Sequence, residues 1–280
     1  MRPSPLRVLL ALLVLPAALA LVSCSRKANA TVSITETCRA QLESARADLA
    51  KLKTVPARET VNAMLSECSG TGFLEEAQYI LAESYFLEEE WTEARGEFDS
   101  YVRFYPNTPF TELAAYKKAV AGFHIPWVLG RDQQSTSDAL EDFGTFLADH
   151  PNSSKADSAR HYVALLNERR AEYDYYVANL YFRMEEYQAA AISMRDFLNE
   201  HPASERVPRV REQLVESYVR LGQIDQAERM VDLFAQETAV PMDEKQAKKF
   251  GERIAAERVK QQKRLAKEQK KRAAEEKELQ

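Results

Sequence analysis

Apolar positions between residues 33 and 236 recur at steps of three and four, which places them on one face of an α-helix. Within this pattern a motif extends over two successive helices. The first helix carries a small residue and then an aromatic residue. The second helix carries an alanine, an aromatic residue four positions later and a closing proline. Ala82, Tyr85, Ala94, Phe98 and Pro106 supply the complete set. A helix pair of this kind buries its apolar face only against neighbouring pairs, so repetition of the pair predicts a solenoid.

The second helix of this motif recurs twice more, and a weaker copy of the whole pair follows. The positions are Ala139, Phe143, Phe146 and Pro151, then Ala190, Met194, Phe197 and Pro202, and finally Tyr218, Ala227, Val231 and Phe234. This spacing is that of the tetratricopeptide repeat. The predicted fold class is therefore all-α: a tetratricopeptide-like solenoid of about five helical hairpins, followed by a charged C-terminal helix.

The distances between the marker alanines are irregular. Successive alanines lie 45, 51 and 37 residues apart, which exceeds the usual repeat length of about 34 residues. The additional residues in the first interval predict an insertion at residues 122–136, between the two helices of the third pair. Those in the second interval fall in residues 154–182, which contain no proline or glycine and therefore predict one long helix.

The first pair carries Cys38 and Cys68, and Pro56 is expected to end its first helix. In an antiparallel helix pair the start of the first helix lies beside the end of the second. This arrangement predicts a disulfide between the two cysteines, which can persist in an oxidising compartment. The alternative is that both are small core residues.

Aromatic residues recur on the first helices with a tyrosine and a phenylalanine seven positions apart. They are Tyr79 and Phe86, Tyr116 and Phe123, and Tyr175 and Phe182. Aromatic side chains on the inner face of a solenoid predict a groove for an extended peptide. In the alternative interpretation, some of them close the core against a neighbouring helix.

The N-terminus predicts secretion and lipid attachment. Two arginines precede the fifteen residues of Val8–Val22, all apolar in character, which is too short for a comfortable membrane span. Leu21-Val22-Ser23-Cys24 resembles the bacterial lipobox, so Cys24 is the expected lipid attachment site; an ordinary signal peptide is the alternative. Ser25 after the cysteine favours the outer membrane of a Gram-negative bacterium, facing the periplasm.

The C-terminal tail differs in charge from the rest of the chain. Residues 243–280 hold 13 Lys and Arg against 8 Asp and Glu, whereas the whole chain has a net charge of −5. A solvated or partly disordered helix is expected, and contact with anionic lipid, peptidoglycan or an acidic partner is the alternative.

The expected organisation of the chain has five parts. They are a signal peptide at 1–23, a lipidated linker at 24–32, N-terminal repeats at 33–122, a segment at 123–242 with the insertion, long helix and C-terminal repeats, and the charged tail at 243–280.

Nothing in the sequence indicates catalysis. His150 and His201 both precede a repeat-closing proline, and His124 and His161 have no carboxylate or cysteine at ligand spacing. There is no glycine-rich phosphate loop and no G-x-S-x-G motif. A non-enzymatic protein without metal or cofactor is expected.

A family resemblance covers about residues 73–236 and is closest at residues 131–182. The "RD" after the insertion, the "HPNS" closure and the "YDYYVANLYF" helix resemble the BamD family of lipoproteins of the outer-membrane barrel assembly machinery. The first pair with its two cysteines and the charged tail depart from the family pattern. The resemblance implies a scaffold that binds the POTRA region of BamA together with other assembly-machinery lipoproteins, and that receives unfolded outer-membrane proteins, whose targeting segment ends in an aromatic residue.

Among the aromatic residues, Tyr79, Phe86 and Tyr116 are the strongest candidates for substrate binding. For partner docking, helix geometry alone suggests a charged face on the first helix of the last pair. This face is formed by Arg209, Glu212, Glu216 and Arg220. Another periplasmic tetratricopeptide lipoprotein, an adaptor for cell division or peptidoglycan synthesis, is the alternative function.

Overall fold

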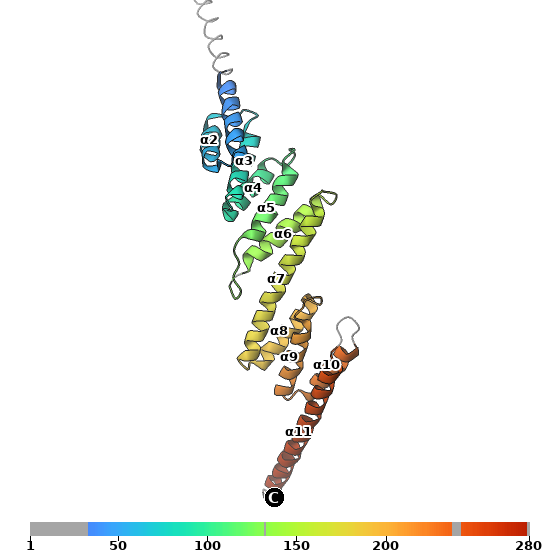
Figure 1. Ribbon diagram of the computed structural model, residues 1–280. Coiled ribbons are helices and arrows are strands. Elements are labelled where there is room, and N and C mark those ends of the chain that lie inside the picture. The colour runs from blue at the N-terminus through green and yellow to red at the C-terminus, as the bar shows by residue number, and fades with distance from the viewer. Residues whose placement is uncertain (1–32, 132, 237–241, 279–280) are drawn as a thin grey trace, which may run out of the picture. The chain divides into compact units, whose positions relative to one another are not determined.

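The computed structural model describes residues 33–131, 133–236 and 242–278 (Figure 1). Throughout these ranges the regular elements are α-helices, which confirms the predicted fold class. The first covers residues 33–50, and the others are α2 (Thr54–Glu67), α3 (Leu74–Leu87), α4 (Trp91–Phe104), α5 (Thr111–His124), α6 (Gln134–Asp149), α7 (Ala156–Arg183), α8 (Tyr187–Glu200), α9 (Val207–Arg220), α10 (Ile224–Gln236) and α11 (Glu244–Glu278). Among the described residues, none of these helices is both long and apolar enough to cross a bilayer.

The repeat residues of the sequence motif occupy the helix contacts. Ala82 of α3 and Ala94 of α4 are both 0% exposed, and Phe98 is completely buried beside them. Alanine at the crossing lets the two backbones approach, and the phenylalanine fills the space that remains. The second-helix residues of the later copies are buried as well: Ala139 and Phe143, Ala190 and Met194, and Ala227 and Val231.

The chain divides into two compact units. The first contains the chain up to Ile125 together with Ser137–Tyr162, and the second contains Pro126–Thr136 and the chain from Val163 onward. This division differs from the expected boundary after residue 122. The α5–α6 pair stays with the first unit because Tyr116 of α5 packs on Phe146 of α6, with ring centroids 5.5 Å apart.

Two element boundaries differ from the prediction. Helix α5 continues to His124 and α6 begins at Gln134, so the described non-helical residues of the insertion are 125–131 and 133, fewer than the expected 122–136. Pro56 does not end the first helix: that helix ends at residue 50, and Pro56 lies in the first turn of α2. Proline is accepted there because the first N–H groups of a helix have no partner within it. The predicted long helix is present as α7.

The two cysteines of the first pair lie side by side in its core. Cys38 is 1% exposed and Cys68 is 0% exposed, and the structure joins them by a disulfide with their Cα atoms 5.9 Å apart. Leu42, Ala45, Val61 and Met64 surround them. The disulfide links the first helix to the end of α2, the connection that the antiparallel pairing predicted.

Candidate functional site

Tyr79, the first residue of the aromatic series, belongs to the core of the first unit. Its side chain is 9% exposed, stacks on Phe110 at 4.7 Å between centroids and meets Phe98 edge-on at 5.9 Å. Burial raises the pKa of its hydroxyl well above the ordinary value, and the nearby Glu83 carboxylate raises it further. Only the margin of this ring reaches the surface.

The other five rings are half-buried, and each contacts a further ring of its own unit. The pairs are Phe86 with Phe98, Tyr116 with Phe146, Phe123 with Tyr162, Tyr175 with Phe197, and Phe182 with Tyr187, at centroid distances from 4.8 to 6.4 Å. These contacts are the ones expected if the aromatic residues close the core. Each of the five side chains nevertheless remains partly exposed.

A basic side chain lies over three of these rings. Lys117 is 4.9 Å from the ring centroid of Phe86, Lys155 is 5.9 Å from Tyr116, and Arg206 is 4.9 Å from Tyr175. The sequence analysis missed these cations because they come from other helices or from the loops between them. Lys117 already forms an ion pair with Glu83, and Arg206 forms one with Glu172. Among the described residues Lys155 has no ion-pair partner, so the site of Lys155 and Tyr116 is the one that suits an aromatic residue beside a carboxylate.

The first unit also holds two adjoining hollows beside the first helix, of about 340 and 390 Å³. Both are lined by Arg46 and Glu76, which form an ion pair, and by Phe110. The smaller one adds mainly apolar side chains: Leu49, Ala50, Tyr79, Ile80 and Leu87. These hollows could not be predicted from the sequence, because their walls come from the first helix, α3 and the α4–α5 connection, which are separate in the chain.

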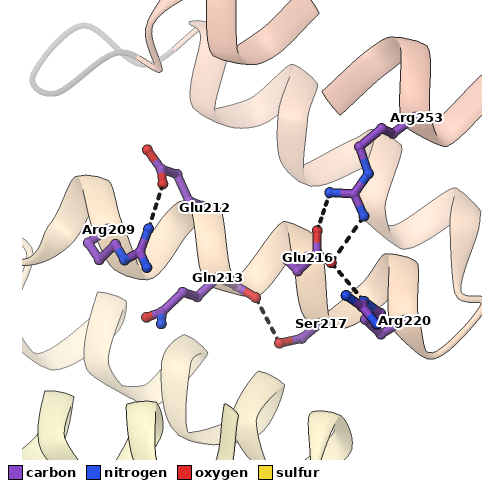
Figure 2. A network of polar contacts seen from close by, with 7 residues as sticks. All are labelled: Arg209, Glu212, Gln213, Glu216, Ser217, Arg220 and Arg253. Atoms are coloured by element: carbon purple, nitrogen blue, oxygen red, sulfur yellow. Dashed lines mark hydrogen bonds and ion pairs between the residues drawn. The ribbon is translucent and has the colours of Figure 1, made fainter. Parts of the chain in front are cut away.

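The charged residues predicted for docking lie together on α9, and all four are engaged in polar contacts within the protein (Figure 2). Glu216 accepts hydrogen bonds from Arg220, at 2.8 Å, and from Arg253 of α11, at 3.0 Å. Glu212 accepts from Arg209 at 3.2 Å and from Gln246 of α11. The side chains of Arg209 and Arg220 stay 60% and 54% exposed, whereas those of Glu212 and Glu216 fall to 24% and 15%.

The electrostatics of Glu216 follow from this arrangement. Burial by itself would raise the pKa of its carboxyl group, but the hydrogen bonds from Arg253 and Arg220 outweigh burial, so the pKa lies below its ordinary value. Glu216 is therefore ionised at neutral pH and joins α9 to α11.

The tail is helical as expected, but the first half of α11 is packed against the repeats and not solvated. Ile254 is 3% exposed in the core of the second unit, with Ala247 and Phe250 packed against the same cluster. Arg258 forms ion pairs with Asp225 at 2.9 Å and Glu228 at 2.6 Å, both on α10. This half of α11 covers the end of the repeat stack, the role of a capping helix in a solenoid.

Potential metal ligands meet at one place in the described ranges. Ligand atoms of Asp174, Glu200 and His201 lie within 4.8 Å of one another. Each already has a protein partner: His201 Nε2 is 2.6 Å from Asp174 Oδ2, and Arg170 donates to Glu200 at 3.2 Å. The sequence analysis attributed His201 to the repeat closure and overlooked Asp174, which lies 27 residues away on α7. The arrangement is that of a buried histidine satisfied by a carboxylate.

Cys24, the predicted lipid attachment site, and the predicted signal peptide lie outside the described residues. Their roles therefore stay predictions from the sequence.

Several proteins of known family resemble this chain. It is 25% identical over 146 residues to "Outer membrane protein assembly factor BamD" of Caulobacter vibrioides, covering 52% of this chain and 48% of that protein. It is 33% identical over 103 residues to the BamD of Vibrio cholerae, covering 37% and 43%. The chain thus spans about half the length of these curated relatives. The BamD of Rickettsia prowazekii is 22% identical over 181 residues, covering 65% of this chain and 72% of that protein.

Among solved structures, a thermophilic TPR protein of Thermus thermophilus aligns with 78% of this chain and 99% of its own, at 16% identity and a TM-score of 0.33. A family model described as "Outer membrane lipoprotein" matches residues 37–233, which include helices of both compact units. Because this match covers more than half of the chain, the protein belongs to the YfiO family of outer membrane lipoproteins.

Proposed function

We propose that this protein is a non-enzymatic scaffold of the outer-membrane barrel assembly machinery, anchored through lipid on Cys24 and facing the periplasm. The observation that carries the proposal is the family match over residues 37–233, together with relatives named as outer membrane protein assembly factors. Helical repeats support it physically, because stacked hairpins present extended surfaces on which several partners can bind.

The first unit would receive unfolded outer-membrane proteins. Tyr116 is the best-placed aromatic residue, since its ring is half-buried and its hydroxyl is 2.8 Å from the Ser158 hydroxyl. Lys155, an exposed cation over the same ring, would bind the terminal carboxylate of a targeting segment while Tyr116 contacts its last aromatic side chain. The smaller hollow, lined by Phe110 and Leu49, would hold apolar side chains further along the segment.

The second unit would dock the POTRA region of a BamA-like protein. Arg209 and Arg220 keep exposed guanidinium groups on α9, and these suit carboxylates of a partner. Glu212 and Glu216 would act indirectly, by holding these arginines and α11 in place. Other lipoproteins of the machinery would bind the remaining repeat surfaces.

Affinity purification of the tagged full chain from detergent-solubilised envelopes tests the scaffold proposal. Recovery of a POTRA-containing barrel protein is the expected result, and Arg220→Glu should reduce that recovery. Recovery of division or cell-wall synthesis proteins without such a barrel would reject the assembly role in favour of an adaptor.

Binding of a labelled peptide tests the substrate site separately. A peptide with a C-terminal phenylalanine should bind the full chain, and conversion of its carboxylate to an amide should weaken binding by about tenfold, as expected for loss of a charge-assisted hydrogen bond. Tyr116→Leu should weaken binding, whereas Tyr116→Phe, which keeps the ring, should not. Equal binding of acid and amide peptides would reject Lys155 as the carboxylate partner.

A further inference from the structure

The second half of α11 contrasts with its packed first half. From residue 262 to residue 275, every residue of α11 is exposed. The last contact with the repeats is made just before, where the Gln261 side chain donates to the Gly222 carbonyl at 3.3 Å. Residues 262–274, here called the basic arm, therefore form a helix without a packed face.

The basic arm concentrates positive charge. It contains six Lys and Arg residues and one acidic residue, Glu268, in a chain whose net charge is −5. A helix of this length extends about 20 Å. Acidic residues resume directly after it, at Glu275 and Glu276, so the positive charge is confined to this window.

Most of this charge is not neutralised by the protein. Arg264 is 3.8 Å from Glu268 and Lys271 is 3.5 Å from Glu275, both at exposed positions where ion pairs are weak. Within the described residues, Lys263, Lys267 and Lys270 have no ion-pair partner. These lysines lie at steps of four and three, so they share one side of the helix.

The root of the arm is fixed to the second unit. Ile254 is buried in its core, and Arg253 and Arg258 are held by carboxylates of α9 and α10. The arm therefore leaves the folded unit from a defined point, and its lysines remain available to a partner.

We propose that the basic arm binds an anionic phospholipid surface. A protein partner would need apolar or aromatic anchors, and the arm has no aromatic residue and only one large apolar side chain, Leu265. Lysine is a strongly hydrated point charge, suited to a diffuse negative surface more than to directional pairing with individual carboxylates. Membership of an outer membrane lipoprotein family brings such a surface within reach.

This binding adds to a lipid anchor without depending on it. A single acyl chain holds a protein weakly at a bilayer, whereas an acyl chain and a polybasic segment together give stable attachment. The proposal is independent of the scaffold function, because neither the peptide site nor the α9 surface is involved.

Vesicle partitioning of the full chain tests the proposal. The measured quantity is the ratio of partition coefficients between vesicles of phosphatidylcholine with phosphatidylglycerol and vesicles of phosphatidylcholine alone. An N-terminal apolar segment or anchor contributes to both compositions and cancels in this ratio. The wild type should prefer anionic vesicles, and the preference should fall steeply as salt is raised.

Two matched triple variants identify the lysines responsible. Lys263/Lys267/Lys270→Gln should reduce the anionic preference by about fivefold for each lysine replaced, because each lysine near an anionic surface contributes to binding. Glutamine is chosen because its helix propensity is similar to that of lysine. Lys245/Lys248/Lys249→Gln removes the same charge from exposed positions on the packed half of α11 and should have a much smaller effect. Circular dichroism verifies that both variants remain helical.

Two results would overturn the proposal. One is a wild-type chain that partitions equally into both vesicle compositions. The other is an equal loss of anionic preference in the two triple variants, which would assign the effect to net charge alone. Replacement of the same three lysines of the arm by arginine should preserve binding, which separates charge from a specific structural role.

Discussion

Arg253 of α11 binds both carboxylate oxygens of Glu216 of α9, with its two terminal nitrogens at 2.5 and 3.0 Å (Figure 2). The two residues are 37 positions apart in the chain. Through this contact the C-terminal helix covers part of the face that the sequence suggested for partner docking. The surface of α9 proposed for docking is consequently narrower than predicted from the sequence, and its exposed arginines lie beside α11 contacts.

We expect Glu216→Gln to loosen α11 and to make the protein less stable at neutral pH. The arginines lower the pKa of Glu216 below 4.5, so this contact stabilises the fold fully above pH 4.5 and is lost as pH falls through the lowered pKa. The expected difference is about 1 kcal/mol, because both arginines are substantially exposed. Thermal unfolding of wild type and variant should differ at pH 7 and converge at low pH.

Glu257→Gln serves as the control for this experiment. Glu257 lies on the same helix and pairs with Lys260 at 3.0 Å, but it does not join α11 to another helix. Its replacement should leave the unfolding temperature nearly unchanged at either pH. A Glu216→Gln protein that stays less stable at low pH would show that packing, and not the charge, is responsible.

Reduction of the Cys38–Cys68 disulfide should loosen the first helix pair selectively. The bond closes a loop with a sequence separation of 30, for which the chain-entropy model gives a loss of roughly 3 to 4 kcal/mol on opening. Limited proteolysis with and without reductant should show new cleavage in residues 33–67. The Cys38→Ala/Cys68→Ala variant should be cleaved there in both conditions; a wild type that resists cleavage after reduction would contradict the prediction.

The repeated helix pairs could be predicted because their signal is local. Ala94 and Phe98 lie four residues apart on one helix, so their joint burial follows from helical spacing alone. The extent of α11 packing could not be predicted in this way. Phe250 and Ile254 are too few to mark a buried face, and the partners of Arg253 and Arg258 lie 30 or more residues away.

The same distinction applies to the candidate sites. The spacing of the aromatic series could not tell core from groove, because the rings that contact Tyr79 come from α4 and from Phe110. The cations over Phe86, Tyr116 and Tyr175 could not be predicted either, because they come from other elements than the rings. Contacts between separate elements require the fold.

Asp142→Ala should strongly destabilise the first unit. The Asp142 side chain is 6% exposed and binds Arg95 at 2.7 Å and Lys118 at 2.9 Å, so its removal leaves two partly buried cations without this partner. We expect a loss of about 2 to 3 kcal/mol in the free energy of unfolding. Asp99→Ala is the matched control, because Asp99 also binds Lys118, at 2.7 Å, but is 45% exposed. Denaturant unfolding should show a loss below about 1 kcal/mol for this control, and equal losses would argue against burial as the cause.

Gly130 and Gly144 should respond in opposite ways to alanine substitution. Gly130, in the insertion, has φ +86°, and a Cβ there would lie 3.1 Å from the hydroxyl oxygen of Tyr176. A left-handed backbone costs an alanine about 1 to 2 kcal/mol, so Gly130→Ala should destabilise the insertion and increase its cleavage by protease. Gly144 lies within α6, and a Cβ there would meet nothing within 4 Å.

Gly144→Ala should therefore stabilise the first unit by about 1 kcal/mol, the difference in helix propensity between the two residues. Unfolding temperature measures this gain, and proteolysis of residues 125–133 measures the effect at Gly130. If both substitutions stabilised the protein, the left-handed turn would be dispensable, and the insertion would tolerate a different backbone path beside Tyr176. If both destabilised it, the exposed face of α6 would carry a contact that alanine disturbs.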